Sequence, residues 1–282
     1  MAPATATSSA VDALRAATDA LAAAGVETPR LDAELLLAGA TGWDRVRLAA
    51  EPERALPPGS SRAFGALVRR RLRREPVAYI LGHKGFRRIE LEVDRRALIP
   101  RPETELLVEV ALKLSPGRVL DVGTGSGAVA LAIADELTGC EVTATDTSPD
   151  ALELARANAE RLGLAARVRL AAGTLPGAGG GWDLVVANLP YVSESDWEGL
   201  APEIREHEPR EALVAGPTGL EAIEVLLEEL GRERVASAVA LEVGAGQADA
   251  VAELARRVGF ERTERRRDLA GIERVVSAQS AR

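Results

Sequence analysis

The feature that most constrains the fold is a mostly apolar run at residues 119–122, which passes into a glycine-rich turn and then into small apolar residues at 128–134. The turn consists of Gly123, Thr124, Gly125, Ser126 and Gly127. A strand that turns at glycines and continues as a helix lets a nucleotide-like ligand approach the backbone closely. We therefore expect a ligand at the carboxyl end of this strand.

A second apolar segment, at residues 141–145, ends in Asp146, whose carboxylate can accept both hydroxyl groups of a ribose. The spacing also satisfies the dinucleotide pattern Gly-x-Gly-x-x-Gly/Ala through Gly123, Gly125 and Ala128, with an acid about 20 residues further on. This motif alone is equally compatible with NAD and with S-adenosylmethionine.

Strand-like and helix-like segments alternate from about residue 97 onward, with strands expected near residues 118, 141, 167, 183, 236, 260 and 273. Such alternation predicts an α/β fold in which helices cover both faces of a mostly parallel seven-stranded sheet. The preceding third predicts a small all-α domain, with helices that begin near Ser9, Thr28 and Ser60. We place the domains at 1–85 and 97–282, joined by a hairpin linker at 86–96.

Asn188, Leu189, Pro190 and Tyr191 follow the apolar segment 183–187. Pro190 has no N–H and leaves the carbonyl of Leu189 free. That carbonyl and the side-chain oxygen of Asn188 can each accept one hydrogen of a planar NH2 group, and the Tyr191 ring can stack on its plane. Taken alone, the segment could equally be a polar turn that caps a strand.

The glycine turn and the amide-accepting turn together favour a methyltransferase that acts on nitrogen. Methyl transfer from a sulfonium is an in-line displacement, so the protein mainly has to position the nitrogen and disperse the developing charge. Neither a metal nor a nucleophilic side chain is required, and the two distant histidines, His83 and His207, make no metal site.

The chain resembles the class I, S-adenosylmethionine-dependent methyltransferases, and more narrowly the release-factor glutamine N5-methyltransferases. The strings that carry this resemblance lie at 74–82, 98–105, 123–127, 188–191, 208–213, 242–247 and 268–274. The most specific of them is Ile-Pro-Arg-Pro-Glu-Thr-Glu, at residues 99–105. The resemblance implies a Rossmann-like class I methyltransferase domain behind a helical domain that docks the substrate.

Carried over by position, the resemblance implies that residues 123–127 wrap S-adenosylmethionine and that Asp146 holds its ribose. Asn188 and Tyr191 are the implied catalytic residues. The turn 188–191 would receive the glutamine of a Gly-Gly-Gln motif in a peptide chain release factor, and Asn188 would also lie close to the cofactor. S-adenosylhomocysteine would be the product.

The sequence departs from the family pattern at two places. Leu189 replaces the first proline of Asn-Pro-Pro-Tyr, which a residue acting through its carbonyl should tolerate. Gly173, Thr174 and Leu175 stand where relatives have an acid followed by a bulky residue. Thr174 would then contact the adenine through its hydroxyl, and Leu175 would pack on the ring.

The charge distribution indicates the class of substrate, and the cysteine content indicates the cellular compartment. Residues 1–85 carry 12 Lys and Arg against 9 Asp and Glu, whereas the rest carries 23 against 34. An acidic catalytic part argues against stable nucleic-acid binding and favours a protein substrate. One cysteine, Cys140, fits a reducing compartment, and we expect it to be buried. The absence of a leader-like start and of a long apolar run predicts a cytoplasmic protein without a membrane span.

Several readings stay open. The arginine-rich run at 69–74 is either a solvated helix face or a docking surface for an acidic partner. The glycine-rich segment 177–181 is expected to be a surface connection. The rival functions are an adenine-N6 methyltransferase acting on DNA or RNA, and an NAD-binding oxidoreductase or non-catalytic nucleotide-binding module.

Overall fold

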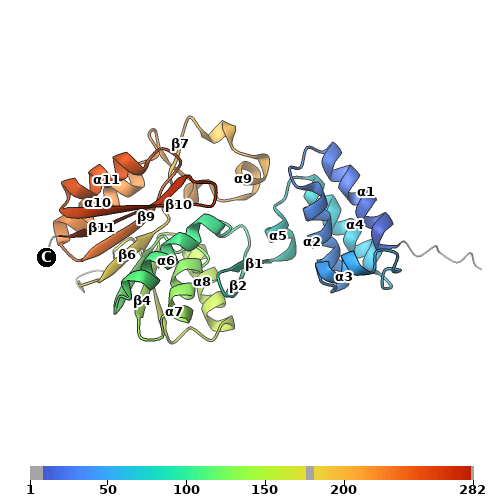
Figure 1. Ribbon diagram of the computed structural model, residues 1–282, viewed down its shortest axis with the longest axis horizontal. Coiled ribbons are helices and arrows are strands. Elements are labelled where there is room, and N and C mark those ends of the chain that lie inside the picture. The colour runs from blue at the N-terminus through green and yellow to red at the C-terminus, as the bar shows by residue number, and fades with distance from the viewer. Residues whose placement is uncertain (1–8, 176–180, 281–282) are drawn as a thin grey trace, which may run out of the picture. The chain divides into compact units, whose positions relative to one another are not determined.

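The computed structural model describes residues 9–175 and 181–280, which form two compact units. The helical unit contains the chain up to Gly82 together with Pro202–His207, and the α/β unit contains His83–Ala201 and the chain from Glu208 onward. Figure 1 shows the elements of each unit. The units divide at Gly82, three residues before the expected domain end, and the helical unit includes a segment from far along the sequence.

The α/β unit is built on a seven-stranded sheet with the strand order β10-β11-β9-β6-β3-β4-β5. Its strands are β3 (Arg118–Val122), β4 (Glu141–Asp146), β5 (Val168–Ala172), β6 (Leu184–Ala187), β9 (Ala238–Glu242), β10 (Phe260–Arg267) and β11 (Glu273–Ser280). The strands β5, β4, β3, β6 and β9 run parallel to one another, and β11 is antiparallel to both β9 and β10. The predicted mostly parallel sheet is confirmed.

Five helices flank this sheet: α6 (Glu105–Leu114), α7 (Ala128–Glu136), α8 (Pro149–Arg161), α10 (Glu221–Glu233) and α11 (Ala248–Arg257). Figure 1 shows α10 and α11 on one face and α7 and α8 on the other. Alternate residues of the central strands, such as Leu120 and Val122 of β3, pack with the apolar sides of α10 and α11. Because both faces of β3 are covered, its side chains are buried along nearly the whole strand.

A hairpin of β1 (His83–Phe86) and β2 (Ile89–Glu92) opens the α/β unit. It begins three residues before the hairpin expected from the sequence. Asn158, fully buried on α8, accepts a hydrogen bond from the Glu92 amide at 2.7 Å and donates to the Glu92 carbonyl at 3.0 Å. The hairpin is therefore bonded to the α/β unit and is not a free linker.

The segment after β6 carries short elements that the sequence pattern did not reveal. They are β7 (Val192–Ser193), η2 (Trp197–Gly199), η3 (Arg210–Ala212) and β8 (Val214–Gly216). A further short element, η1 (Pro102–Thr104), lies directly before α6 and was also not predicted. The strands β7 and β8 pair parallel to each other. Apolar periodicity cannot identify elements of two or three residues, because they are shorter than one period of a buried face.

The helical unit consists of α1 (Ala10–Ala23), α2 (Pro29–Thr41), α3 (Arg45–Ala50), α4 (Ser60–Leu72), α5 (Val77–Leu81) and α9 (Pro202–His207). The starts of α1, α2 and α4 agree with the positions expected from the sequence. Ser9 caps α1 by accepting a hydrogen bond from the Asp12 amide, and Pro29 is the first residue of α2, whereas among the described residues α2 and α4 have no side-chain capping hydrogen bond. The six-residue helix α3 and the five-residue helix α5 were not predicted.

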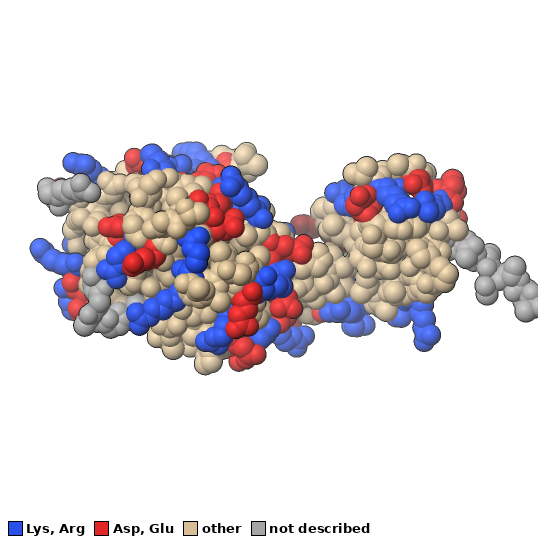
Figure 2. Space-filling view, turned by 90° about the horizontal axis from the view of Figure 1, so that it is seen from below, with Lys and Arg blue, Asp and Glu red and all other residues tan. Residues whose placement is uncertain are grey.

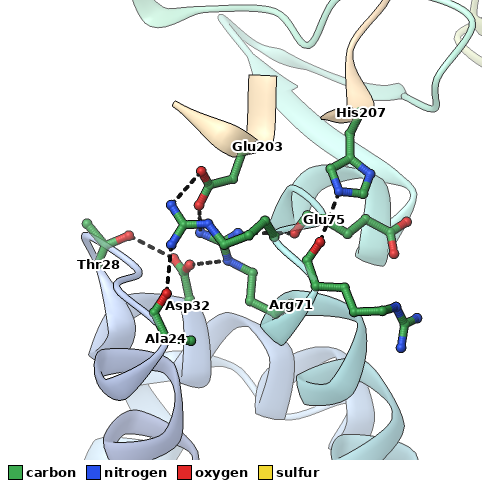
Figure 3. A network of polar contacts seen from close by, with 9 residues as sticks. Ala24, Thr28, Asp32, Arg71, Glu75, Glu203 and His207 are labelled. Carbon is green, nitrogen blue, oxygen red and sulfur yellow. Dashed lines mark hydrogen bonds and ion pairs between the residues drawn. The ribbon is translucent and has the colours of Figure 1, made fainter. Parts of the chain in front are cut away.

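An arginine network joins α9 to the rest of the helical unit (Figure 3). Arg71 is 6% exposed, and its guanidinium contacts Asp32 Oδ2 and Glu203 Oε1, each at 2.7 Å. Arg74 reaches Glu203 Oε2 at 2.7 Å. Asp32 also accepts a hydrogen bond from the Thr28 hydroxyl at 2.8 Å. Two cations therefore share one glutamate from α9.

This network changes the interpretation of the arginine-rich run. Arg70 pairs with Glu75, and Arg71 and Arg74 pair with Glu203, so these three guanidinium groups are engaged within the helical unit. Arg69 and Arg73 remain exposed. The run is therefore not a wholly solvated helix face, and it cannot act as a docking surface over its whole length.

Three further expectations concern single residues and segments. Cys140 is buried, as predicted, and burial raises the pKa of its thiol. Within residues 9–175 and 181–280, no helix is both long and apolar enough to cross a membrane. The expected glycine-rich connection at 177–181 lies outside the described residues except for Gly181.

We predict that Glu203→Ala lowers the free energy of unfolding of the helical unit by about 3 kcal/mol, because it leaves two largely buried guanidinium groups without their shared carboxylate. Urea unfolding followed by circular dichroism measures this loss. Glu206→Ala removes an exposed glutamate from the same helix and serves as the control. Equal unfolding midpoints for the two variants would contradict the prediction.

Candidate active site

The turn after β3 alternates glycines in a left-handed conformation with Thr124 and Ser126. Gly123, Gly125 and Gly127 have φ angles of 72°, 57° and 85°. Such angles are unfavourable for residues with a Cβ atom, which explains the glycine at each alternate position. The amides of Gly123 and Thr124 both donate to the Thr145 carbonyl at 2.9 Å, so the turn is fixed to the end of β4.

Asp121, on β3, holds the same turn from inside. Its side chain is 2% exposed, and its Oδ2 accepts hydrogen bonds from the Thr124 hydroxyl at 2.7 Å and from the Ala130 amide at 3.1 Å. Burial raises the pKa of this carboxyl to about 7, although both hydrogen bonds act against the rise. Asp121 thus connects strand, turn and helix α7. Nothing in the sequence pattern distinguishes Asp121, because it lies within an apolar run.

Asp146 ends β4 and faces the glycine turn. Its Oδ2 accepts from the Gly125 amide and its Oδ1 accepts from the Ser148 amide, each at 2.9 Å. These two bonds fix the carboxylate in position, and each oxygen keeps a further lone pair for a ligand hydroxyl. The expected ribose acceptor is therefore held rigidly beside the turn.

Thr174 and Leu175 follow β5 and lie in different surroundings. The Thr174 carbonyl accepts a hydrogen bond from the Thr145 hydroxyl at 2.8 Å, and Thr174 lines a cavity that Asp146 and Asn188 also line. Leu175 packs against the hydrophobic core that includes Trp182 and Val185. The adenine contacts suggested for both residues stay predictions.

The turn 188–191 leaves the end of β6 beside the glycine turn. A Cβ atom built on Gly123 would lie 3.0 Å from Leu189 Cδ2, so the two turns approach closely. Asn188 Nδ2 donates to Thr104 Oγ1 at 3.1 Å, and the Tyr191 carbonyl accepts from Gln247 Nε2 at 3.0 Å. Both ends of the turn are therefore anchored by residues far away in the sequence.

Tyr191 is half-buried, and its ring lies near Gly244, where an added Cβ would be 3.2 Å from Tyr191 Cδ2. Burial raises the pKa of its phenol to about 12, and the nearby Glu242 carboxyl adds to the rise. The phenol is consequently neutral at physiological pH and cannot serve there as a base. Its stacking role on a substrate amide stays a prediction.

A cavity of about 500 Å³ opens where the carboxyl ends of β3, β4, β5 and β6 meet. It brings together these predicted site residues: Gly123, Thr124, Gly125, Ser126, Asp146, Asn188, Leu189 and Pro190. Three other predicted residues, Gly127, Leu175 and Tyr191, are not among the described residues that line it. Its size lies within the range of small-molecule and cofactor sites.

Sequence reasoning missed several residues of this cavity. Ile99, Pro100 and Thr104 come from the 99–105 string, which served only to identify the resemblance. Glu221 and Val225 come from α10, whose position depends on tertiary packing. Among the described residues, no group of three or more His, Cys, Asp or Glu side chains is placed to hold a metal ion.

Comparison with family models places two matches on the chain. Residues 12–82 match the PrmC N-terminal domain, and residues 119–207 match a methyltransferase domain. Curated relatives named "Release factor glutamine methyltransferase" cover nearly the whole chain. The one from Moorella thermoacetica is 44% identical over 89% of this chain and 91% of its own length. Those from Geobacter sulfurreducens and Caulobacter vibrioides are 41% and 40% identical over 92% and 94% of both chains.

Solved structures share the fold of the α/β unit at low sequence identity. The hMettl16 catalytic domain, in complex with a MAT2A 3'UTR hairpin, has a TM-score of 0.58 and 14% identity over 68% of this chain and 76% of its own. A methyltransferase from Pyrococcus furiosus has a TM-score of 0.50 and 20% identity, and covers 68% of this chain and 89% of its own. These likenesses establish a class I methyltransferase fold.

We predict that Asp121 makes the protein less stable as the pH rises from about 4 to about 7. In that window the folded protein retains a proton on Asp121, whose pKa is about 7, whereas the unfolded chain has released it. The free energy of unfolding should therefore fall, by at most about 4 kcal/mol for this group. Asp121→Asn cannot titrate and should gain stability relative to the native protein over the same range.

Urea titrations of both proteins at several pH values test this expectation. Asp135→Asn, an exposed change on α7, is the control and should stay parallel to the native protein at every pH. A constant stability difference between Asp121→Asn and the native protein across the range would show that Asp121 has an ordinary pKa.

Proposed function

This chain belongs to the release factor glutamine methyltransferase family, and we propose that it transfers a methyl group from S-adenosylmethionine to N5 of the glutamine in the Gly-Gly-Gln motif of a peptide chain release factor. One observation carries the proposal. The amide-accepting residues Asn188 and Leu189 line the same cavity as the glycine turn and Asp146. A flat amide and a nucleoside can therefore meet there.

The residues of the cavity fit this cofactor. The three glycines of the turn leave backbone without side chains, Asp146 offers carboxylate oxygens to a ribose, and Thr174 lines the wall expected to face the adenine. When bound, S-adenosylmethionine supplies an electrophilic methyl group on a sulfonium; the N–C bond forms as the C–S bond breaks, S-adenosylhomocysteine leaves, and the amide releases one proton to water.

The chain's own contribution is to hold the nitrogen. The Asn188 side-chain oxygen and the Leu189 carbonyl accept the two hydrogens of the substrate NH2, which fixes the amide plane relative to the methyl group. Both acceptors also stabilise the positive charge that develops on this nitrogen. Tyr191 is neutral at neutral pH, because its pKa of about 12 excludes it as a base there. We propose that its ring packs on the substrate amide, although it is not among the described residues that line the cavity.

Charge supports a protein partner. The chain has a net charge of −8, and on the face drawn in Figure 2 Lys and Arg intermingle with Asp and Glu and form no continuous basic stripe. Tight nucleic-acid binding requires many phosphate contacts from clustered cations.

The buried Cys140 agrees with a reducing compartment, and we propose the cytoplasm as the location of the protein.

We predict that Asn188→Ala lowers kcat at least about 100-fold, as when a single transition-state hydrogen-bonding group is removed, while affinity for S-adenosylhomocysteine stays within about threefold. Mass spectrometry of a Gly-Gly-Gln release factor after incubation with enzyme and S-adenosylmethionine gives the turnover, and calorimetry gives the affinity. Glu160→Ala, an exposed change on α8, is the control.

Three results would count against the proposed function. If the native enzyme adds no methyl group to that glutamine, the substrate assignment is wrong. Salt-sensitive binding and methylation of DNA or RNA would favour the adenine-N6 alternative. Binding of NADH without S-adenosylhomocysteine would favour the oxidoreductase or nucleotide-binding alternative.

A further inference from the structure

We infer that Thr104 and Glu242 are positioning residues that hold the Asn188 amide with its oxygen available to the substrate. This inference rests on the proposed function, because it explains how the amide acceptor is oriented. Three polar groups lie in a row: Asn188 directly after β6, Thr104 in η1, and Glu242 at the end of β9.

The first link fixes the nitrogen of the asparagine. Asn188 Nδ2 donates to Thr104 Oγ1 at 3.1 Å, and Thr104 is 4% exposed. An NH2 group can only donate, so Thr104 Oγ1 acts as the acceptor in this bond. The hydroxyl hydrogen of Thr104 must therefore be directed elsewhere.

The second link supplies the acceptor for that hydrogen. The Glu242 carboxyl, which is 2% exposed at the end of β9, lies close enough to the Thr104 hydroxyl for that hydroxyl to lower its pKa. When it is ionised, at a pH above its pKa, this carboxylate accepts and cannot donate, so it orients the hydroxyl hydrogen away from Asn188 Nδ2. Burial raises the pKa of Glu242 to about 7, with the bond from Thr104 acting against the rise. Its Oε2 atom has no hydrogen-bond partner among the described residues.

The charges around Glu242 are mixed. Glu103 raises its pKa, whereas Arg274 and Arg101 lower it. A carboxyl buried at this cost is unusual unless a polar group depends on it. The Thr104 hydroxyl is the neighbouring group that lowers the pKa of this carboxyl, and Thr104 lines the cavity of the proposed substrate site. The cluster is thus a support for the turn 188–191.

Orientation matters because the two ends of an asparagine amide have opposite hydrogen-bonding character. If the amide turned by 180°, its NH2 would face the NH2 of the substrate, and two donors would meet. Fixing the nitrogen on Thr104 leaves Oδ1 as the end that can accept a substrate hydrogen. Thr104 and Glu242 therefore set which substrate group Asn188 recognises, without touching the substrate.

The other end of the turn has its own anchor. Gln247 Nε2 donates to the Tyr191 carbonyl at 3.0 Å, and Gln247 Oε1 accepts from the Gly244 amide at 2.8 Å. This second clamp should keep the backbone of the turn in place when Thr104 changes. A variant of Thr104 then tests side-chain orientation and leaves the path of the backbone intact.

The experiment compares Thr104→Val with Thr104→Ser in the full chain. Valine keeps the shape of threonine and removes the hydroxyl, whereas serine keeps the hydroxyl. We expect Thr104→Val to lower kcat for glutamine methylation about 10-fold, the worth of one oriented hydrogen bond. Thr104→Ser should restore most of the turnover. Both should bind S-adenosylhomocysteine within about threefold of the native affinity and remain folded at the assay temperature.

Two further variants separate positioning from general damage. In an Asn188→Ala background, Thr104→Val should cause no additional loss of kcat, because the amide it orients is absent. Glu242→Leu, which removes the acceptor, should reproduce the 10-fold loss and should not add to Thr104→Val. Methyl incorporation into the release factor is measured in every case.

The outcomes are distinct. Equal turnover of Thr104→Val and Thr104→Ser, or a full additional loss in the Asn188→Ala background, would overturn the inference while leaving the proposed function intact. Native turnover in Glu242→Leu would remove Glu242 from the chain of groups. If the native enzyme does not methylate the release factor, the proposed function itself fails, which the native reaction reveals before any variant is compared.

Discussion

The site depends on one constraint, which is that the backbone after β3 must adopt left-handed angles at three glycines within five residues and still stay fixed. Asp121 meets this constraint by accepting hydrogen bonds from Thr124 on the turn and from Ala130 on helix α7. The carbonyl of Thr145 holds the turn from the β4 side. Asp146 and Leu189 lie against the fixed turn, and residues of all three line the cavity.

The parts of this arrangement that could be predicted from sequence are those with local causes. Positive φ angles require glycine, a proline cannot continue a ladder, and a covered parallel strand is apolar along its length. For these reasons the glycine turn, the turn at Asn188 and the seven main strands could be recognised, and the carboxyl ends of parallel strands necessarily share one edge. The helix starts at Ser9 and Thr28 follow from the same kind of local signal.

The parts that could not be predicted depend on contacts between distant residues. Thr104 reaches Asn188 across 84 positions in the sequence, and Arg71 reaches Glu203 across 132. No local pattern distinguishes Arg71, which is buried, from Arg69 and Arg73, which are exposed two residues away on either side. Asp121 lies within an apolar strand, so the role of its carboxylate became clear only from its partners on the turn and on helix α7.

The placement of α9 has a consequence for how such a protein can be divided. The chain passes between the two units three times, at residues 82, 201 and 207, so the helical unit is not a self-contained cassette at the amino terminus. A gene fragment that stops at Gly82 would encode the bundle without Glu203, and would leave the Arg71 and Arg74 side chains without the carboxylate they share. Exchange of this module between relatives by recombination would have to carry over the distant six-residue helix as well.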